Sequence, residues 1–296
     1  MQRFFITLSF DGTAYHGWQI QPNGISVQER LQQALTTLLR QPVEVVGAGR
    51  TDAGVHARMM VAHFDHPQVS LPADLAAYGQ QLAYRLNRIL PADIAVQRVE
   101  AVASDMHARF SATSRTYHYY LHTTKDPFLR HYSWETHYQL DFPLMNEAAQ
   151  WLLSQQDFAA FCKAGADVKT TLCQLTHAQW RQLSPDEWRF EITANRFLRN
   201  MVRAVVGTLV EVGRHRMTLD DFRRVIEGKQ RTQAGESMPA KALFLENVVY
   251  GSMPRNFDAS KLRNLETSKL RSLEISKSRN IEVSEYRNFK TSKITK

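Results

Sequence analysis

Strand-like segments alternate with amphipathic helices along the first 254 residues, and this alternation constrains the fold more than any other feature of the sequence. Alternating apolar residues and β-branched or aromatic content predict strands at 4–10, 43–46, 59–64, 94–102, 117–122, 174–182, 188–194 and 243–249. Apolar residues spaced three and four apart predict helices at 27–39, 74–90, 145–153, 198–212 and 220–227. We predict two α+β domains, residues 1–105 and 106–254, each with mostly antiparallel strands and helices on one face.

A glycine-rich segment at 47–57 follows the strand expected at 43–46 and has the sequence G-A-G-R-T-D-A-G-V-H-A. Three glycines within eight residues permit tight turns and a close approach of the backbone to a ligand. The segment presents a cation and a carboxylate, Arg50 and Asp52. A carboxylate in such a loop is a nucleophile, a general base, a metal ligand or a cap of a turn. The segment is not a P-loop, because the lysine and the hydroxyl residue of that motif are missing.

The net charge of +8 is concentrated at the C-terminal end of the chain. Residues 255–296 hold 11 of the 37 Lys and Arg and 5 of the 29 Asp and Glu, so they carry +6 and residues 1–254 carry +2. They repeat a unit of eight residues, which begins at Arg255, Arg263, Arg271, Arg279 and Arg287. In a helix an apolar stripe would drift by about 80° per unit of eight. We expect a flexible basic tail without a functional role, and the alternative is a tether that attracts RNA.

The cysteines and histidines show no pattern of a disulfide framework or a metal site. Two cysteines, and no apolar stretch near the ~20 residues of a membrane span, indicate a cytoplasmic protein with reduced thiols. Cys162 has no evident basic partner, so we interpret it as a small buried residue. The spacing of the histidines is not that of zinc ligands, and we expect neither a metal nor a cofactor.

Three further segments carry dense motifs of glycine, aromatic and basic residues. Residues 10–19 have the sequence F-D-G-T-A-Y-H-G-W-Q, residues 107–119 contain H-A-R-F-S-A and R-T-Y-H-Y, and residues 194–203 have the sequence A-N-R-F-L-R-N-M-V-R. Together with the glycine-rich segment they resemble the signatures of the tRNA pseudouridine synthase A family. The resemblance extends over about residues 3 to 250 and ends where the repeats of eight begin.

The resemblance implies a role for four residues. Asp52 matches the catalytic aspartate, and Arg50 matches the arginine that helps to displace the target base from its stack. Tyr117 matches the aromatic residue that packs against the target uracil, and Arg203 matches the basic residue that pairs with the catalytic carboxylate. A neighbouring arginine favours the charged form of an aspartate. From the residues alone, Arg203 also fits a solvated helix flank, and one of Tyr117 and Tyr119 is expected to lie in the core.

The resemblance also implies a fold and a reaction. The fold is α+β, with two related domains whose sheets form one mixed sheet around a central cleft and with helices on the outer face. The reaction isomerises uridine to pseudouridine at positions 38–40 of the anticodon stem-loop of tRNA, and the enzyme is a homodimer without a cofactor. Two alternatives are a non-catalytic RNA-binding protein on the same fold and an N-glycosidase that releases free uracil.

Overall fold

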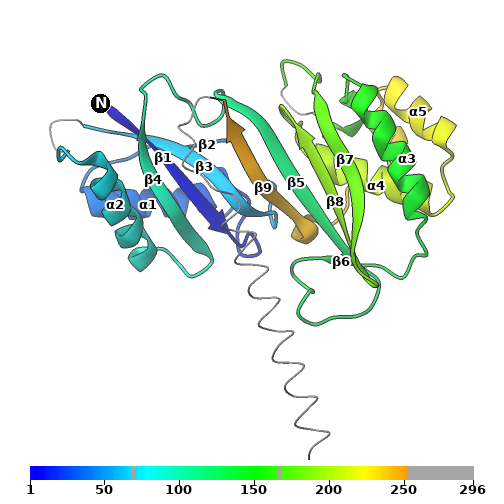
Figure 1. Cartoon of the computed structure of the whole chain (residues 1–296), viewed down its shortest axis with the longest axis horizontal. Coiled ribbons are helices and arrows are strands. Elements are labelled where there is room, and N and C mark those ends of the chain that lie inside the picture. The colour runs from blue at the N-terminus through cyan, green and yellow to red at the C-terminus, as the bar shows by residue number, and fades with distance from the viewer. Residues whose placement is uncertain (68–70, 166–167, 252–296) are drawn as a thin grey trace, which may run out of the picture. The chain divides into compact units, whose positions relative to one another are not determined.

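The computed structural model describes residues 1–251 apart from 68–70 and 166–167. A mixed, mostly antiparallel sheet runs through this part of the chain in the order β4-β1-β3-β9-β5-β8-β7, with β2 beside β3 and β6 beside β5 (Figure 1). The strands are β1 (Gln2–Phe10), β2 (Val46–Gly47), β3 (His56–His66), β4 (Ile94–Val102), β5 (Ala112–His122), β6 (Trp134–Glu135), β7 (Leu175–Ser184), β8 (Glu187–Ala194) and β9 (Leu243–Tyr250). The helices are α1 (Val27–Leu39), α2 (Leu75–Ile89), α3 (Phe142–Trp151), α4 (Met201–Gly213) and α5 (Leu219–Glu227). The α+β class predicted from the sequence is confirmed.

The last strand joins the two halves of the chain into one sheet. β9 lies between β3 of the first half and β5 of the second. Its Leu245 pairs with Ala57 in the parallel direction and with Tyr117 in the antiparallel direction. The register between β5 and β9 shifts beside Tyr117, and such a bulge changes the direction of neighbouring side chains. The boundary predicted near residue 105 falls in the connection between β4 and β5, and the division into two domains stays a prediction.

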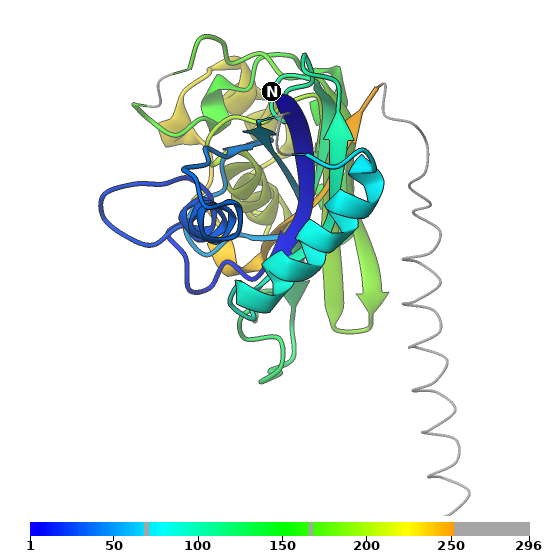
Figure 2. The same ribbon diagram turned by 90° about the vertical axis from the view of Figure 1, so that its left-hand side faces the viewer.

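The helices cover the two ends of the sheet in separate groups. Figures 1 and 2 show α1 and α2 beside the strands of the first half, and Figure 1 shows α3, α4 and α5 beside β7 and β8. Phe4 of β1 packs against Tyr78 of α2, with ring centroids 5.7 Å apart. In the second half, Tyr119 of β5 is fully buried in an apolar core with α3 and α4. Each group of helices therefore buries the apolar face of its own strands.

The strand predicted at 43–46 is shorter in the structure, because helix side chains take the place of a neighbouring strand. Only Val46 and Gly47 pair with β3. The N–H of Val45 donates to Oε1 of Gln32, and the carbonyl of Val45 accepts from Nε2 of Gln28. Both glutamines belong to α1, so the backbone at Val45 is satisfied without strand pairing.

The helix predicted at 198–212 begins three residues later, at Met201. Asn200 has a φ of 66°, which lies in the left-handed region. This residue is therefore not part of the right-handed helix, which starts after it. Its Nδ2 donates to Oγ of Ser237. Residues 195–200 therefore form a loop in front of α4, and this loop has the sequence N-R-F-L-R-N, which is the larger part of the motif at 194–203.

The repeats predicted to form a flexible tail, residues 255–296, lie outside the described residues. Within residues 1–251, excluding the two short gaps, no helix has the length and the apolar character needed to cross a membrane.

Candidate active site

The loop that carries Asp52, residues 48–55, connects β2 to β3 and lies directly on residues 11–18; we call it the Asp52 loop. A Cβ on Gly17 would lie 2.3 Å from the carbonyl oxygen of Thr51. A Cβ on Gly12 would lie 2.0 Å from the carbonyl oxygen of Val55. Gly17 also has a φ of 87°, which favours glycine. The two glycines of the 10–19 motif therefore permit the close approach that fixes the Asp52 loop.

Asp52 pairs with Arg203, which the chain places in the first turn of α4. Nη1 of Arg203 donates to Oδ2 of Asp52 at 3.2 Å. Both side chains are largely buried, with exposed fractions of 27% for Asp52 and 20% for Arg203. Oδ1 of Asp52 has no hydrogen-bond partner among the described residues. One carboxylate oxygen is thus held by the guanidinium, and the other is available to react.

A second contact fixes the orientation of Arg203. Its Nε donates to the carbonyl of Met238 at 2.6 Å, and the N–H of Met238 donates back to the carbonyl of Arg203. The chain near Met238 packs tightly on α4, since a Cβ on Gly207 would lie 1.8 Å from the carbonyl oxygen of Glu236. The guanidinium is therefore held between a carboxylate and a carbonyl, with one hydrogen bond to each.

Tyr117 is half-buried on β5, near the Asp52 loop. Its ring meets the ring of Phe197 edge to face, with centroids 5.1 Å apart. Burial raises the pKa of Tyr117 to about 12, the charge of Arg115 opposes this shift, and the charge of Asp52 adds to it. The phenol is therefore protonated at neutral pH. Tyr119, two residues further along, is the core tyrosine of the pair, because it is fully buried.

Arg50 lies in the Asp52 loop and is exposed. Among residues that the structure describes, it has no hydrogen bond or ion pair. Its guanidinium is free to contact a ligand.

His56 connects the end of the Asp52 loop with two segments of the second half. It is 1% exposed, and its Nδ1 accepts from the N–H of Gly12 at 3.0 Å. Its Nε2 lies 3.0 Å from the carbonyl of Lys241 and 3.1 Å from that of His131. Burial lowers the pKa of His56, although the nearby carboxylate of Asp11 opposes this shift. A neutral ring accepts at Nδ1 and donates at Nε2, so His56 is a structural link between the halves.

Comparison with known proteins identifies the family. The family described as tRNA pseudouridine synthase matches residues 6–111 and 148–251. The tRNA pseudouridine synthase A of Bacteroides fragilis is 56% identical over 250 residues, which cover 84% of this chain and 97% of that protein. Proteins of the same name are 54% identical over 253 residues in Porphyromonas gingivalis (85% and 98% covered) and 38% identical over 252 residues in Bacillus subtilis (84% and 99% covered). The chain belongs to the tRNA pseudouridine synthase family.

The family confirms the resemblance found in the sequence and gives the class of reaction. A pseudouridine synthase is an isomerase, which converts uridine to pseudouridine in tRNA. Arg50, Asp52 and Arg203 lie within the two matched stretches, and Tyr117 lies between them. The structure nevertheless brings Arg203 into contact with Asp52, and Tyr117 close enough for the charge of Asp52 to act on its pKa, whereas Arg50 is near Asp52 because it belongs to the same loop.

Phe197, His56 and Arg115 also lie at or beside the candidate site, although the sequence motifs imply no role for them. Phe197 stands in the N-R-F motif and Arg115 in the R-T-Y motif, so both were visible as motif members without a role. His56 contacts backbone carbonyls of residues that are distant in the sequence, and the sequence around His56 does not predict these contacts.

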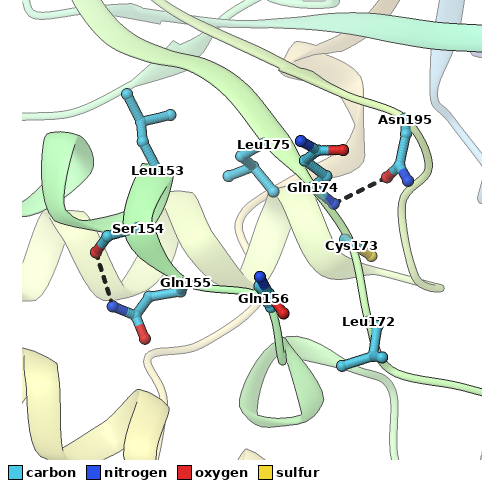
Figure 3. A pocket seen from close by; sticks show the side chains of 9 residues that line it. All are labelled: Leu153, Ser154, Gln155, Gln156, Leu172, Cys173, Gln174, Leu175 and Asn195. Carbon is cyan, nitrogen blue, oxygen red and sulfur yellow. Dashed lines mark hydrogen bonds between the residues drawn. The ribbon is translucent and has the colours of Figure 1, made fainter.

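A polar pocket of about 410 Å³ lies apart from these four residues, beside η2 (Leu152–Ser154) and the start of β7 (Figure 3). Three glutamines and Asn195 line it, together with Ser154, Cys173 and three leucines. Burial raises the pKa of Cys173 to about 11, so this thiol is protonated at neutral pH. In the described part of the chain, no group of three or more His, Cys, Asp and Glu is arranged to hold a metal ion.

Proposed function

We propose that this enzyme isomerises uridine at positions 38–40, in the anticodon stem-loop of tRNA. The geometry of the Asp52 carboxylate supports the proposed catalysis. One of its oxygens accepts a hydrogen bond from Arg203, and the other has no partner among the described residues. The position within tRNA rests on the resemblance of the four motifs to the tRNA pseudouridine synthase A family.

The chemistry exchanges one bond to the ribose for another. The bond from C1′ to N1 of uracil breaks, the base turns, and a bond from C1′ to C5 forms. C5 loses a proton and N1 gains one, so the reaction is balanced without an oxidant or an energy donor. Asp52 acts as the nucleophile on the ribose or the base, or as the base in an elimination, and each of these routes needs an unprotonated carboxylate oxygen.

The remaining residues would act on the target base and on the carboxylate. Tyr117 would pack its ring against the extruded uracil, because base stacking on an aromatic ring compensates for stacking lost in the RNA. Arg50 would help to displace the target base from its stack, since its exposed guanidinium has no partner among the described residues. Arg203 would hold Asp52 in the orientation for attack.

The test is pseudouridine mapping in tRNA transcripts that keep a uridine at only one of positions 38, 39 and 40. We expect wild-type protein to modify each of the three transcripts and to leave a transcript without these uridines unmodified. Free uracil is assayed in the same reactions, because its release would indicate an N-glycosidase. Modification at other positions only would contradict the proposed target.

We further propose that the enzyme works as a homodimer in the cytoplasm, on the basis of the same resemblance. Light scattering of the purified protein at micromolar concentration gives its mass in solution. A mass of one chain at all concentrations, with full activity, would contradict the homodimer.

A further inference from the structure

Arg115 of β5 makes an unusual set of contacts near the proposed site. Its Nη1 donates to the carbonyl of Ala112 at 3.0 Å and to that of Asn195 at 2.7 Å. Its Nη2 donates to the carbonyl of Ala48 at 3.1 Å and to that of Arg109 at 2.5 Å. One planar guanidinium thus binds four backbone carbonyls, which matches its fixed arrangement of donors.

The bound carbonyls come from three motifs that are far apart in the sequence. Ala48 begins the Asp52 loop, and Arg109 belongs to the H-A-R-F motif. Asn195 begins the loop that carries Phe197, whose ring meets Tyr117. Arg115 itself precedes Tyr117 by two residues on the same strand, so the two side chains share a face of the sheet.

No carboxylate contacts Arg115 among the residues that the structure describes. Its charged neighbours are instead Arg109 and Arg196, and burial together with these two charges lowers the pKa of the guanidinium. By contrast, Arg189 on β8 has Glu191 as its partner, with Nε 3.0 Å from Oε1. The four hydrogen bonds to carbonyls compensate for the hydration that the half-buried charge of Arg115 loses, so the guanidinium holds the segments that carry these carbonyls together.

We propose that Arg115 is a positioning residue, which fixes the Asp52 loop relative to Tyr117 and Phe197 through the four carbonyls. It acts on the reaction by setting the distance from the carboxylate to the stacked base. A displacement of about 1 Å in such a geometry reduces rates by about 100-fold. This inference rests on the proposed function, because it assigns Arg115 to the step that Asp52 performs.

The test compares Arg115→Lys and Arg115→Met with wild type in single-turnover reactions at saturating tRNA. We expect both variants to form pseudouridine roughly 10- to 100-fold more slowly, with a Kd for tRNA within about twofold of wild type. Lys should not rescue the rate, because an ammonium keeps the charge without the planar arrangement of donors. Arg115→Gln is the second variant if Arg115→Met fails to fold.

Arg189→Met is the matched control, since Arg189 is a half-buried arginine of the neighbouring strand. It pairs with Tyr120, three residues from Tyr117, and so lies on the opposite face of the sheet. We expect it to lower the Tm without changing the single-turnover rate of the folded protein.

Three results would overturn the role of Arg115. A wild-type rate in Arg115→Lys would show that charge alone suffices. A weaker Kd with a salt slope lower by about one and an unchanged rate would show a phosphate contact. An equal loss of rate in Arg189→Met would show a general effect of lost stability. If wild type itself forms no pseudouridine, the proposed function fails instead, so the two failures are distinguishable.

Discussion

The two carboxylate oxygens of Asp52 have different surroundings, and the proposed chemistry depends on this difference. Oδ2 contacts Arg203, and Oδ1 has no partner among the described residues. Arg203 is in turn fixed by the carbonyl of Met238. A reactive carboxylate needs this combination of a fixed direction and a free lone pair.

Replacing Arg203 by Lys or Met should slow pseudouridine formation at saturating tRNA roughly 10- to 100-fold, because a hydrogen bond between charged groups contributes about 1.5–3 kcal/mol. An ammonium is a point charge and does not reach both Asp52 and Met238 with the geometry of a guanidinium. Single-turnover rates measured between pH 6 and 8 check this expectation. Wild-type rates in Arg203→Met across that range would contradict the role of the pair.

Tyr117→Phe should retain most of the activity, and Tyr117→Ala should lose more, because the ring and not the hydroxyl is expected to pack against the base. The loss in Tyr117→Ala should correspond to about 1–3 kcal/mol of stacking. Tyr120→Ala is the control, since Tyr120 lies on the opposite face of the same strand. Equal rates for Tyr117→Ala and wild type would assign Tyr117 to packing alone.

The four proposed site residues could be named from the sequence because each stands in a motif that resembles a known family, and their roles stay predictions. Arg115 could not be named in this way, although it stands beside Tyr117 in the R-T-Y motif. Its partners are backbone carbonyls of three distant segments, and a carbonyl has no sequence signature. The sequence does not distinguish an arginine that is solvated from one that binds the carbonyls of three distant segments.

Among the elements, the conformation of the Asp52 loop depends on residues 11–18, on which the loop packs. Gly17 and Gly12 approach the loop so closely that a Cβ would collide with its carbonyls. Local periodicity predicted the helices and strands. The predicted and observed ends of two elements differ, because particular residues there change the hydrogen bonding or the conformation of the backbone. Gln28 and Gln32 replace a strand partner at Val45, and left-handed Asn200 delays the start of α4.

Gly17→Ala should destabilise the protein by roughly 2–5 kcal/mol, since the left-handed backbone costs ~1–2 kcal/mol and the collision with Thr51 costs ~1–3 kcal/mol. Gly49→Ala is the matched control for stability, because a Cβ there would have no atom of the described structure within 4 Å. Urea denaturation of both variants measures the difference. Equal free energies of unfolding would contradict the close approach at Gly17.

Acid should destabilise the first half through His63, which is 5% exposed and accepts from the N–H of Ala108 at Nδ1. Burial lowers the pKa of His63 to about 4, and the charges of Arg3 and His107 add to the shift. The unfolded chain binds this proton near pH 6.5 and the folded chain only near pH 4, so stability falls as the pH falls through this window. Each unit of pKa shift corresponds to about 1.4 kcal/mol and solvent screens part of the effect, so the expected loss is about 1–3 kcal/mol.

Urea denaturation at pH 7, 6, 5 and 4 measures this loss. His63→Gln should flatten the pH dependence, whereas His137→Gln, at a side chain that is 81% exposed, should leave it unchanged. The same slope in wild type and His63→Gln would show that His63 is not the group that titrates.

At the scale of the whole molecule, one continuous sheet brings the site together. Asp52 comes from the first half of the chain, and Arg203 and Tyr117 come from the second. β9 joins the halves through its pairing with β3 and β5. Local periodicity predicted β9 as a strand, but the pairing of distant strands has no local signal, so only the resemblance implied that the sheets join.

We propose that this molecule uses the Asp52 carboxylate to isomerise uridine, and does not merely bind tRNA. The most direct test maps pseudouridine in tRNA after incubation with wild type and with Asp52→Asn, while measuring the Kd of each protein for tRNA. We predict pseudouridine at positions 38–40 with wild type, none with folded Asp52→Asn, and a Kd within about twofold, because phosphate contacts dominate binding. Pseudouridine formed by Asp52→Asn, or tight binding by wild type without any pseudouridine, would contradict the claim.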